Sequence, residues 1–162
     1  MHRKMSRLIV TPLVTVAAAS LSMGVAHADP WNSVDLFPPK DPVETPFCSI
    51  DYIDPNDFGR SDRSDVTVSS PAPGQVIFTF HTRSQSAAPY TQRARVAWAN
   101  LDTGFNGGGV ATARIEEGET TIELPVQITE PGRITAVTSV TNTADNGQNV
   151  TYYDCSTEYT VP

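Results

Sequence analysis

The sequence predicts an all-β protein: an antiparallel sandwich of about seven strands, preceded by a proline-rich N-terminal arm. Apolar and polar residues alternate with a period of two from about residue 66 to the end of the chain, as they do in strands with one buried face. Turn signals recur between these segments, and helical spacing of apolar residues is absent after residue 28. Short strands separated by regular turns favour a sandwich or barrel over any helical fold.

Residues 1–28 have the three-part pattern of a cleavable secretory signal peptide. Basic residues lie at the start, an apolar stretch follows to about Val25, and residues 26–28 (Ala-His-Ala) supply the small residues that a signal peptidase accepts. Polar residues interrupt the apolar stretch, whereas a membrane span needs about 20 predominantly apolar residues. We therefore expect cleavage, a secreted product in the extracellular space or the periplasm and cell envelope, and no membrane insertion afterwards.

The next segment, residues 29–47, is rich in proline and acidic residues and is expected to form an extended arm, because proline is excluded from helix and sheet interiors. Aromatic side chains in the arm and in the polar stretch behind it have no obvious core to cover them. Such rings can anchor a protein partner or stack on sugars, although Trp31 packed back on the domain is the alternative. The candidate ligand-binding residues are Trp31, Phe37 and Tyr52.

Residues 48–162 are expected to form the sandwich domain. The turn at residues 145–147 (Asp-Asn-Gly) is a strong hairpin signal that opens the last strand. The clearest alternating segments are residues 76–80, 94–98, 122–128 and 134–140.

The two cysteines, Cys48 and Cys155, are expected to form a disulfide bond. Export implies an oxidising compartment, and a single pair allows one intramolecular connectivity. A Cys-x-x-Cys sequence is absent, so a thiol-disulfide catalyst is not expected.

Several stretches resemble strands of bacterial immunoglobulin-like and fibronectin type III-like modules. Trp98 lies in a segment similar to their third strand, where a core tryptophan packs between the sheets. Cys48 lies too far before Trp98 for the inter-sheet disulfide of immunoglobulin domains. The resemblance covers residues 64–162 and implies an immunoglobulin-like sandwich, which by itself implies no function. The matching stretches are residues 96–104, 121–125, 131–137 and 153–155.

The acidic stretch 54–65 has the spacing of a twelve-residue calcium loop, with oxygen-bearing side chains at positions 1, 3, 9 and 12 and Gly59 at position 6. Phe58 stands where another ligand is expected, and an aspartate at position 12 is shorter than the usual glutamate. The ordinary interpretation is a solvated acidic loop, and calcium is the alternative; no other cofactor is expected. The calcium ligands would be Asp54, Asn56, Asp62 and Asp65.

The net charge of the chain bears on its partners, and the lack of catalytic motifs bears on whether it is an enzyme. The formal net charge is −7, and loss of the basic N-terminus makes it more negative, which argues against nucleic acid and anionic membranes as partners. His81 is the single histidine after residue 28, and no Gly-x-Ser-x-Gly elbow is present, so we assign no catalytic residue and expect a surface histidine.

Three arginines, Arg83, Arg93 and Arg95, are candidates for a small basic patch on one sheet, with pairing to nearby carboxylates as the alternative. We expect a non-catalytic extracellular or envelope-associated module whose partner is a protein or a polysaccharide. The alternative is a small secreted hydrolase that uses carboxylates, for which the sequence does not single out a pair.

Overall fold

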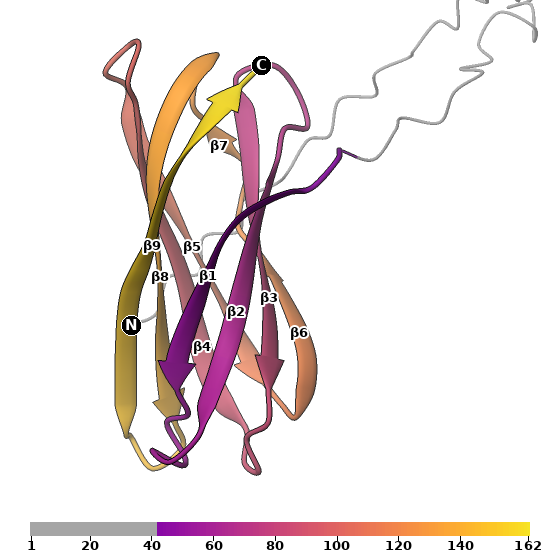
Figure 1. The fold of residues 1–162 in the computed structure, drawn as a ribbon, viewed down its shortest axis with the longest axis vertical. Helices are drawn as coiled ribbons and strands as arrows, with labels where there is room; N and C mark the ends of the chain where they lie inside the picture. The colour runs from indigo at the N-terminus through magenta and orange to yellow at the C-terminus, as the bar shows by residue number, and fades with distance from the viewer. Residues whose placement is uncertain (1–41) are drawn as a thin grey trace, which may run out of the picture. The chain divides into compact units, whose positions relative to one another are not determined.

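The computed structural model describes residues 42–162, which form nine β-strands and no helix (Figure 1). The strands make two antiparallel sheets, so the predicted all-β sandwich architecture is confirmed in its coarse form. In the described part of the chain, no helix has the length and hydropathy that crossing a membrane requires. The strands are β1 (Thr45–Ile53), β2 (Ser61–Ser69), β3 (Gln75–Ser84), β4 (Tyr90–Asn100), β5 (Asn106–Ile115), β6 (Gly118–Glu123), β7 (Gln127–Ile128), β8 (Gly132–Ala144) and β9 (Asn149–Val161).

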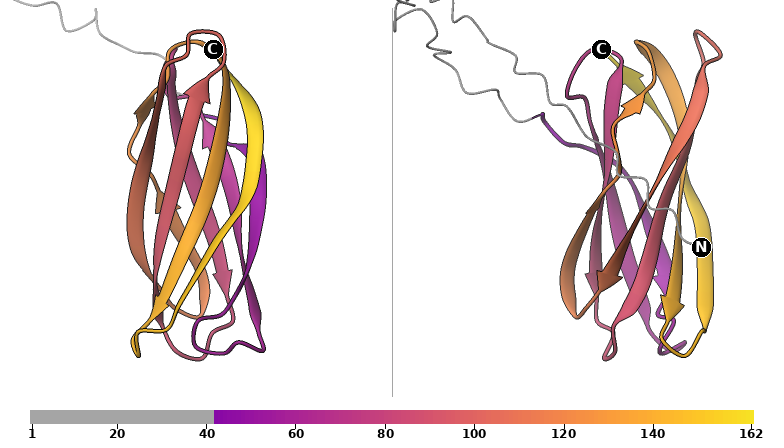
Figure 2. Two further views of the ribbon diagram at one scale, coloured as in Figure 1. Left: turned by 90° about the vertical axis from the view of Figure 1, so that its left-hand side faces the viewer. Right: turned by 180° about the vertical axis from the view of Figure 1, so that it is seen from behind.

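The chain passes between the two sheets several times. One sheet has the strand order β1-β2-β3-β6, with the short β7 also paired to β3, and the other has the order β5-β4-β8-β9. The chain therefore crosses from β3 to β4, returns from β5 to β6, and crosses again from β7 to β8, and the two sheets lie face to face (Figure 2). Strands that are distant in the sequence, such as β4 and β8, become neighbours.

Inward-facing residues of both sheets build the core. Phe78 and Phe80 of β3 are fully buried, and Trp98 of β4 is 6% exposed. Burying side chains of this size contributes roughly 1.5–3 kcal/mol each. The alternation of apolar and polar residues along each strand gives the sheet its buried inner face. In β3, Val76, Phe78 and Phe80 point inward, as the period-two pattern predicts.

The first two strands begin earlier than the sequence suggests. β1 starts inside the expected arm, and β2 starts inside the expected acidic loop. Pro46 is accommodated because β1 is an edge strand and its register with β2 shifts between Pro46 and Cys48, a position at which a missing N–H group is tolerated. In β2 the alternation is present, but its first inward residues, Asp62 and Ser64, are polar.

The predicted disulfide bond is confirmed. Cys48 lies in β1 and Cys155 in β9, with Cα atoms 5.9 Å apart. These strands are the outer strands of different sheets, so the bond joins the two sheets at one side of the sandwich. A disulfide fits the oxidising compartment that the predicted signal segment implies; that segment and residues 29–41 of the arm lie outside the described residues.

Candidate binding surface

The outer face of the sheet β5-β4-β8-β9 carries two shallow hollows. They have volumes of about 200 and 320 Å³, and they share Arg95 and Ala97 of β4, so they lie on either side of this strand. The first hollow is lined by Arg95, Ala97, Val137, Ser139 and Tyr153. The second is lined by Arg95, Val96, Ala97, Gly107, Gly108, Gly109 and Val110.

The second hollow lies over three successive glycines of β5, of which Gly108 faces outward, whereas Cβ atoms on Gly107 and Gly109 would meet Trp98 and Gln127 on the inner side. A Cβ atom on Gly107 would lie 2.8 Å from Cζ2 of Trp98, and one on Gly108 would lie 2.5 Å from the carbonyl oxygen of Val96. Both distances are closer than side chains tolerate, so the close packing of β5 on β4 requires glycine at these positions. The sequence shows the glycine run but gives no sign that it lies beside Arg95 on a sheet surface.

Tyr153 borders the first hollow because of a β-bulge. Thr138 pairs with Cys155 and Val140 pairs with Tyr152, so two residues of β9 oppose Ser139 of β8. A bulge of this kind reorients side chains, and Tyr153 is 66% exposed. In the sequence, Tyr153 stands out only for its spacing to Cys155 and not as a surface aromatic residue, although a second consecutive tyrosine, after Tyr152, already breaks the alternation.

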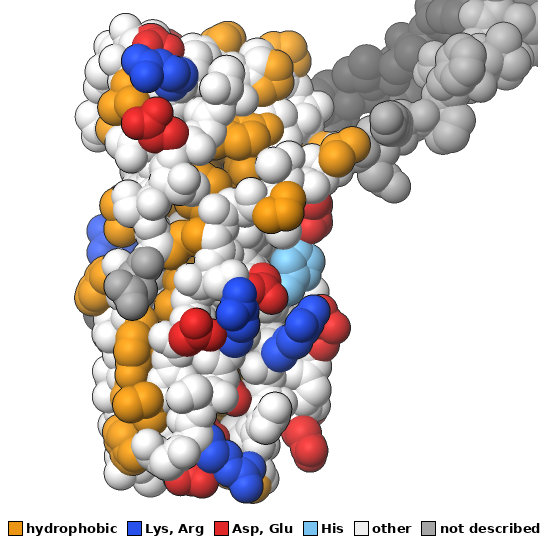
Figure 3. Space-filling model, in the orientation of Figure 1, with side chains coloured by type: hydrophobic (Ala, Val, Ile, Leu, Met, Phe, Trp, Pro, Cys, Tyr) orange, Lys and Arg blue, Asp and Glu red, His pale blue; other side chains and the backbone are white. Residues whose placement is uncertain are grey.

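The two sheets differ in charge. The strands β5, β4, β8 and β9 contain four arginines and two acidic residues. The strands of the other sheet contain two arginines and five acidic residues, with acidic side chains and arginines side by side on the face seen in Figure 3. An anionic group therefore meets a more favourable field at the hollows than on the opposite face.

The expected arginine patch is divided between the sheets. Arg93 and Arg95 both lie on β4, whereas Arg83 lies on β3 in the other sheet. Among the side chains that the structure describes, neither Arg93 nor Arg95 forms an ion pair. Arg114 on β5 is different, because it forms a two-pronged ion pair with Asp145, and this ion pair holds the pKa of the Asp145 carboxyl below its usual range.

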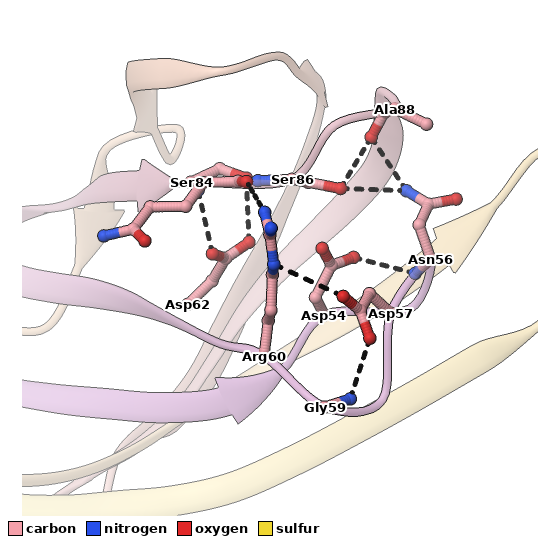
Figure 4. A network of polar contacts seen from close by, with 10 residues as sticks. Asp54, Asn56, Asp57, Gly59, Arg60, Asp62, Ser84, Ser86 and Ala88 are labelled. Carbon is pink, nitrogen blue, oxygen red and sulfur yellow. Dashed lines mark hydrogen bonds and ion pairs between the residues drawn. The ribbon is translucent and has the colours of Figure 1, made fainter.

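The four proposed calcium ligands do not converge, because each is engaged by different partners; Figure 4 shows three of them, Asp54, Asn56 and Asp62. Asp54 accepts a hydrogen bond of 2.7 Å from the backbone N–H of Asn56, and the Asn56 amide donates to the carbonyl oxygen of Ala88 at 2.8 Å. Asp65 instead accepts hydrogen bonds from Ser49 and Arg63, which lower the pKa of its carboxyl. Within residues 42–162, no three acidic, histidine or cysteine side chains form a metal-binding group.

The fourth proposed ligand, Asp62, points into the protein. It is 4% exposed and accepts hydrogen bonds from the hydroxyl groups of Ser84 (2.7 Å) and Tyr90 (3.0 Å) and from the backbone N–H of Gln85 (3.0 Å). Asp54 is also buried, and its Oδ2 atom has no partner among the described residues; a bound water is the ordinary partner of such an atom.

The expectation that Tyr52 is an exposed binding residue is wrong. Tyr52 belongs to β1 and is 2% exposed. Its hydroxyl lies 3.0 Å from that of Tyr90 and accepts a hydrogen bond from Gln92, whose amide also donates to Asn142. Burial raises the pKa of both tyrosines. Trp31 and Phe37, the other two aromatic candidates, lie outside the described residues.

These side chains form a hydrogen-bonded polar layer inside one end of the sandwich, and nearly all of them are buried. Nearly every polar group in the layer has a hydrogen-bond partner, the Nδ2 atom of Asn142 being the exception, so the layer replaces apolar packing at a limited desolvation cost. The residues that form the layer are Tyr52, Asp62, Ser64, Thr82, Ser84, Tyr90, Gln92 and Asn142.

His81 lies on the outward side of β3. Its Nε2 atom is 3.0 Å from Oε2 of Glu44 and 3.3 Å from the hydroxyl of Thr67. This arrangement ties the chain before β1 to the sheet surface, and no serine hydroxyl is its partner among the described contacts.

The fold and its surface define the class of this protein as a disulfide-linked, two-sheet antiparallel β-sandwich with two shallow hollows on one face that share Arg95. No model of a known protein family matches the chain, and no curated protein and no solved structure matches it either.

Proposed function

We propose that the protein is a secreted, non-catalytic binding module that holds an acidic polysaccharide across the outer face of the sheet β5-β4-β8-β9. The observation that carries this proposal is the pair of adjoining hollows with Arg95 between them and the exposed ring of Tyr153 at one end. A guanidinium group binds carboxylate or sulfate groups with charge-assisted hydrogen bonds, and an aromatic ring offers a flat apolar surface to a sugar.

The shape of the surface favours a polymer over a small molecule. Small-molecule sites are usually concave and enclose most of the ligand, whereas these hollows are shallow and lie in a row across the strands. Protein partners gain most of their binding energy from side chains buried in desolvated apolar pockets. The hollows instead place the polar groups of Arg95 and Ser139 beside small side chains, an arrangement that favours a sugar chain.

The same surface argues against the alternative of a hydrolase that uses carboxylates. Glycoside hydrolysis needs two carboxyl groups roughly 5 to 9.5 Å apart on either side of the scissile bond. Among the described side chains, no aspartate or glutamate lines either hollow. Asp62, the most buried acidic residue of strand β2, accepts its hydrogen bonds inside the core.

We also propose that the sandwich is immunoglobulin-like. The order β2-β3-β6 opposite β5-β4-β8-β9 corresponds to that of immunoglobulin-like sandwiches, with the third of these strands in chain order carrying a buried tryptophan. In this alignment β1 is an additional strand at the N-terminal side, and the disulfide bond links it to β9 rather than joining the central strands.

Binding to immobilised polysaccharides tests the proposed function. We expect the protein to bind a carboxylated chain such as polygalacturonate more tightly than neutral dextran, with affinity that falls as salt is added. Arg95→Ala and Tyr153→Ala should each weaken binding by roughly tenfold, which is about 1.4 kcal/mol. Arg83→Ala, which removes an exposed arginine from the other sheet, is the matched control and should leave binding unchanged. Equal loss in Arg83→Ala and Arg95→Ala, or no preference for the acidic chain, would contradict the proposal.

A further inference from the structure

The sandwich has strands at four edges, and three of these edges are protected against pairing with another chain. Exposed edges present unpaired N–H and C=O groups, and proteins block them with proline, bulges or charge. β1 contains Pro46 and a register shift, and β9 contains the bulge opposite Ser139. β6 carries Glu119 and Glu123 along its short length.

The fourth edge, β5, has none of these protections. Its ten residues, Asn106–Ile115, contain no proline and no acidic residue. Its pairing with β4 runs without a register shift from Tyr90 opposite Ile115 to Ala99 opposite Asn106. The one charged residue, Arg114, is already paired with Asp145. β5 is therefore an edge strand without a bulge that is free to accept a further strand.

We propose that β5 pairs with β5 of a second copy of this chain, antiparallel about a two-fold axis at Val110, so that two four-stranded sheets become one sheet of eight strands. Such an interface uses the same surface on both copies. With Val110 opposite itself, the glycines 107–109 face residues 111–113 (Ala-Thr-Ala), and Arg114 faces Asn106. Small side chains thus meet glycine, Val110 meets its own copy, and no like charges lie directly opposite each other.

The charges around β5 permit a second copy to approach. The protein is acidic overall, so two copies repel each other least at an edge strand that itself contains no aspartate or glutamate. Arg95 pairs with Val110 across β4 and β5, so the Arg95 residues of the two copies would be three strand spacings apart, about 14 Å at ~4.8 Å per strand. This distance exceeds the Debye length of about 8 Å at physiological salt, so their repulsion is largely screened.

Exposed apolar side chains beside the edge provide a further driving force. Gln127 of β7 lies against Gly109, and its neighbours Val126 and Ile128 are 46% and 58% exposed. Phe105, just before β5, is 48% exposed. Exposed apolar side chains beside a strand edge favour association, and pairing of β5 would cover part of this apolar surface. The inference depends on the strand edge and not on the ligand surface proposed above.

Sedimentation velocity of the purified protein, from micromolar to millimolar concentration and without ligand, tests the pairing. We expect a concentration-dependent monomer–dimer equilibrium. Val110→Lys places two lysines opposite each other on the axis and should raise the dimer dissociation constant by at least roughly tenfold. Val137→Lys is the matched control, because Val137 is an equally exposed valine (41% against 39%) on the same sheet but on the interior strand β8; it should leave the dissociation constant unchanged. Far-ultraviolet circular dichroism and melting temperature verify that both variants are folded.

Val110→Cys tests the register, because only a residue on the axis is opposite its own copy at a distance that a disulfide can span. We expect this variant to form a covalent dimer under mild oxidation, and Val137→Cys to remain monomeric. A protein that stays monomeric throughout the concentration range, a dimer that Val110→Lys and Val137→Lys weaken equally, or a dimer in which Val110→Cys does not cross-link would each overturn the proposal. None of these results depends on polysaccharide binding, so the two proposals fail separately.

Discussion

Replacing both cysteines with alanine is expected to lower the free energy of unfolding by about 5 kcal/mol. Cys48 and Cys155 are separated by 107 residues, and the chain-entropy relation for a closed loop of that length gives about 4.8 kcal/mol at 25 °C. The loss is a large part of the total, because domains of this size are typically stable by 5–15 kcal/mol. Changing both residues avoids leaving a lone buried thiol, since Cys155 is 2% exposed.

Urea unfolding of the parent protein and the Cys48→Ala/Cys155→Ala variant measures this difference. The parent protein treated with a reducing agent and an alkylating agent is a second comparison, and its unfolding should resemble that of the variant. Most of the effect should appear in the folding rate, because the cross-link restricts the unfolded chain. A loss of less than about 1 kcal/mol would show that the unfolded chain already keeps β1 near β9 and would refute the entropy argument.

Three further outcomes follow from the polar layer and the acidic loop. Above about pH 10 the tyrosines of the unfolded chain ionise, whereas the raised pKa values of Tyr52 and Tyr90 keep both protonated in the folded protein. The free energy of unfolding should therefore be constant below pH 10 and fall above it by up to roughly 2.7 kcal/mol per pH unit for the two groups. Urea unfolding at several alkaline pH values measures this slope, and a flat profile would contradict the prediction. Asp62→Ala leaves the hydroxyl donors of Ser84 and Tyr90 without their acceptor and should lower the free energy of unfolding by about 2–4 kcal/mol. Asp57→Ala, at an exposed loop position, is the control and should change it by less than about 0.5 kcal/mol. Equal melting temperatures of the two variants would rule out the structural role of Asp62. Because the four proposed ligands do not converge, calcium followed by a chelator should leave the melting temperature unchanged, and a rise with calcium would reinstate the site.

The apolar strands could be predicted from the sequence because their inward residues are hydrophobic. Residues 76–80, 94–98 and 134–140 lie in β3, β4 and β8 as their period-two pattern predicts. The start of β2 could not be predicted in this way, because its buried residues are Asp62 and Ser64. Their partners come from other strands, and only the folded arrangement makes polar residues acceptable in the interior.

The candidate surface could not be predicted for a different reason. The glycine run at 107–109 and Tyr153 lie far apart in the sequence, and the strand order β5-β4-β8-β9 brings both beside Arg95. A pattern within one segment does not show which strands become neighbours, so it gives the glycines no place on a surface, and it does not show a tyrosine whose exposure depends on a bulge. The expectation for Tyr52 was wrong because this residue lies just before the acidic stretch 54–65 in the sequence, whereas its environment in the fold is the core.

The position of the disulfide bond has a consequence for a protein under tension. If the two ends of the described domain were pulled apart, the force would pass from residue 48 directly to residue 155 through the sulfur atoms. Residues 49–154, which contain nearly all of both sheets, would carry none of the load. Extension would stop once the short segments outside the bridge had detached, so the outer face of the sheet β5-β4-β8-β9 would keep its shape while the chain was stretched.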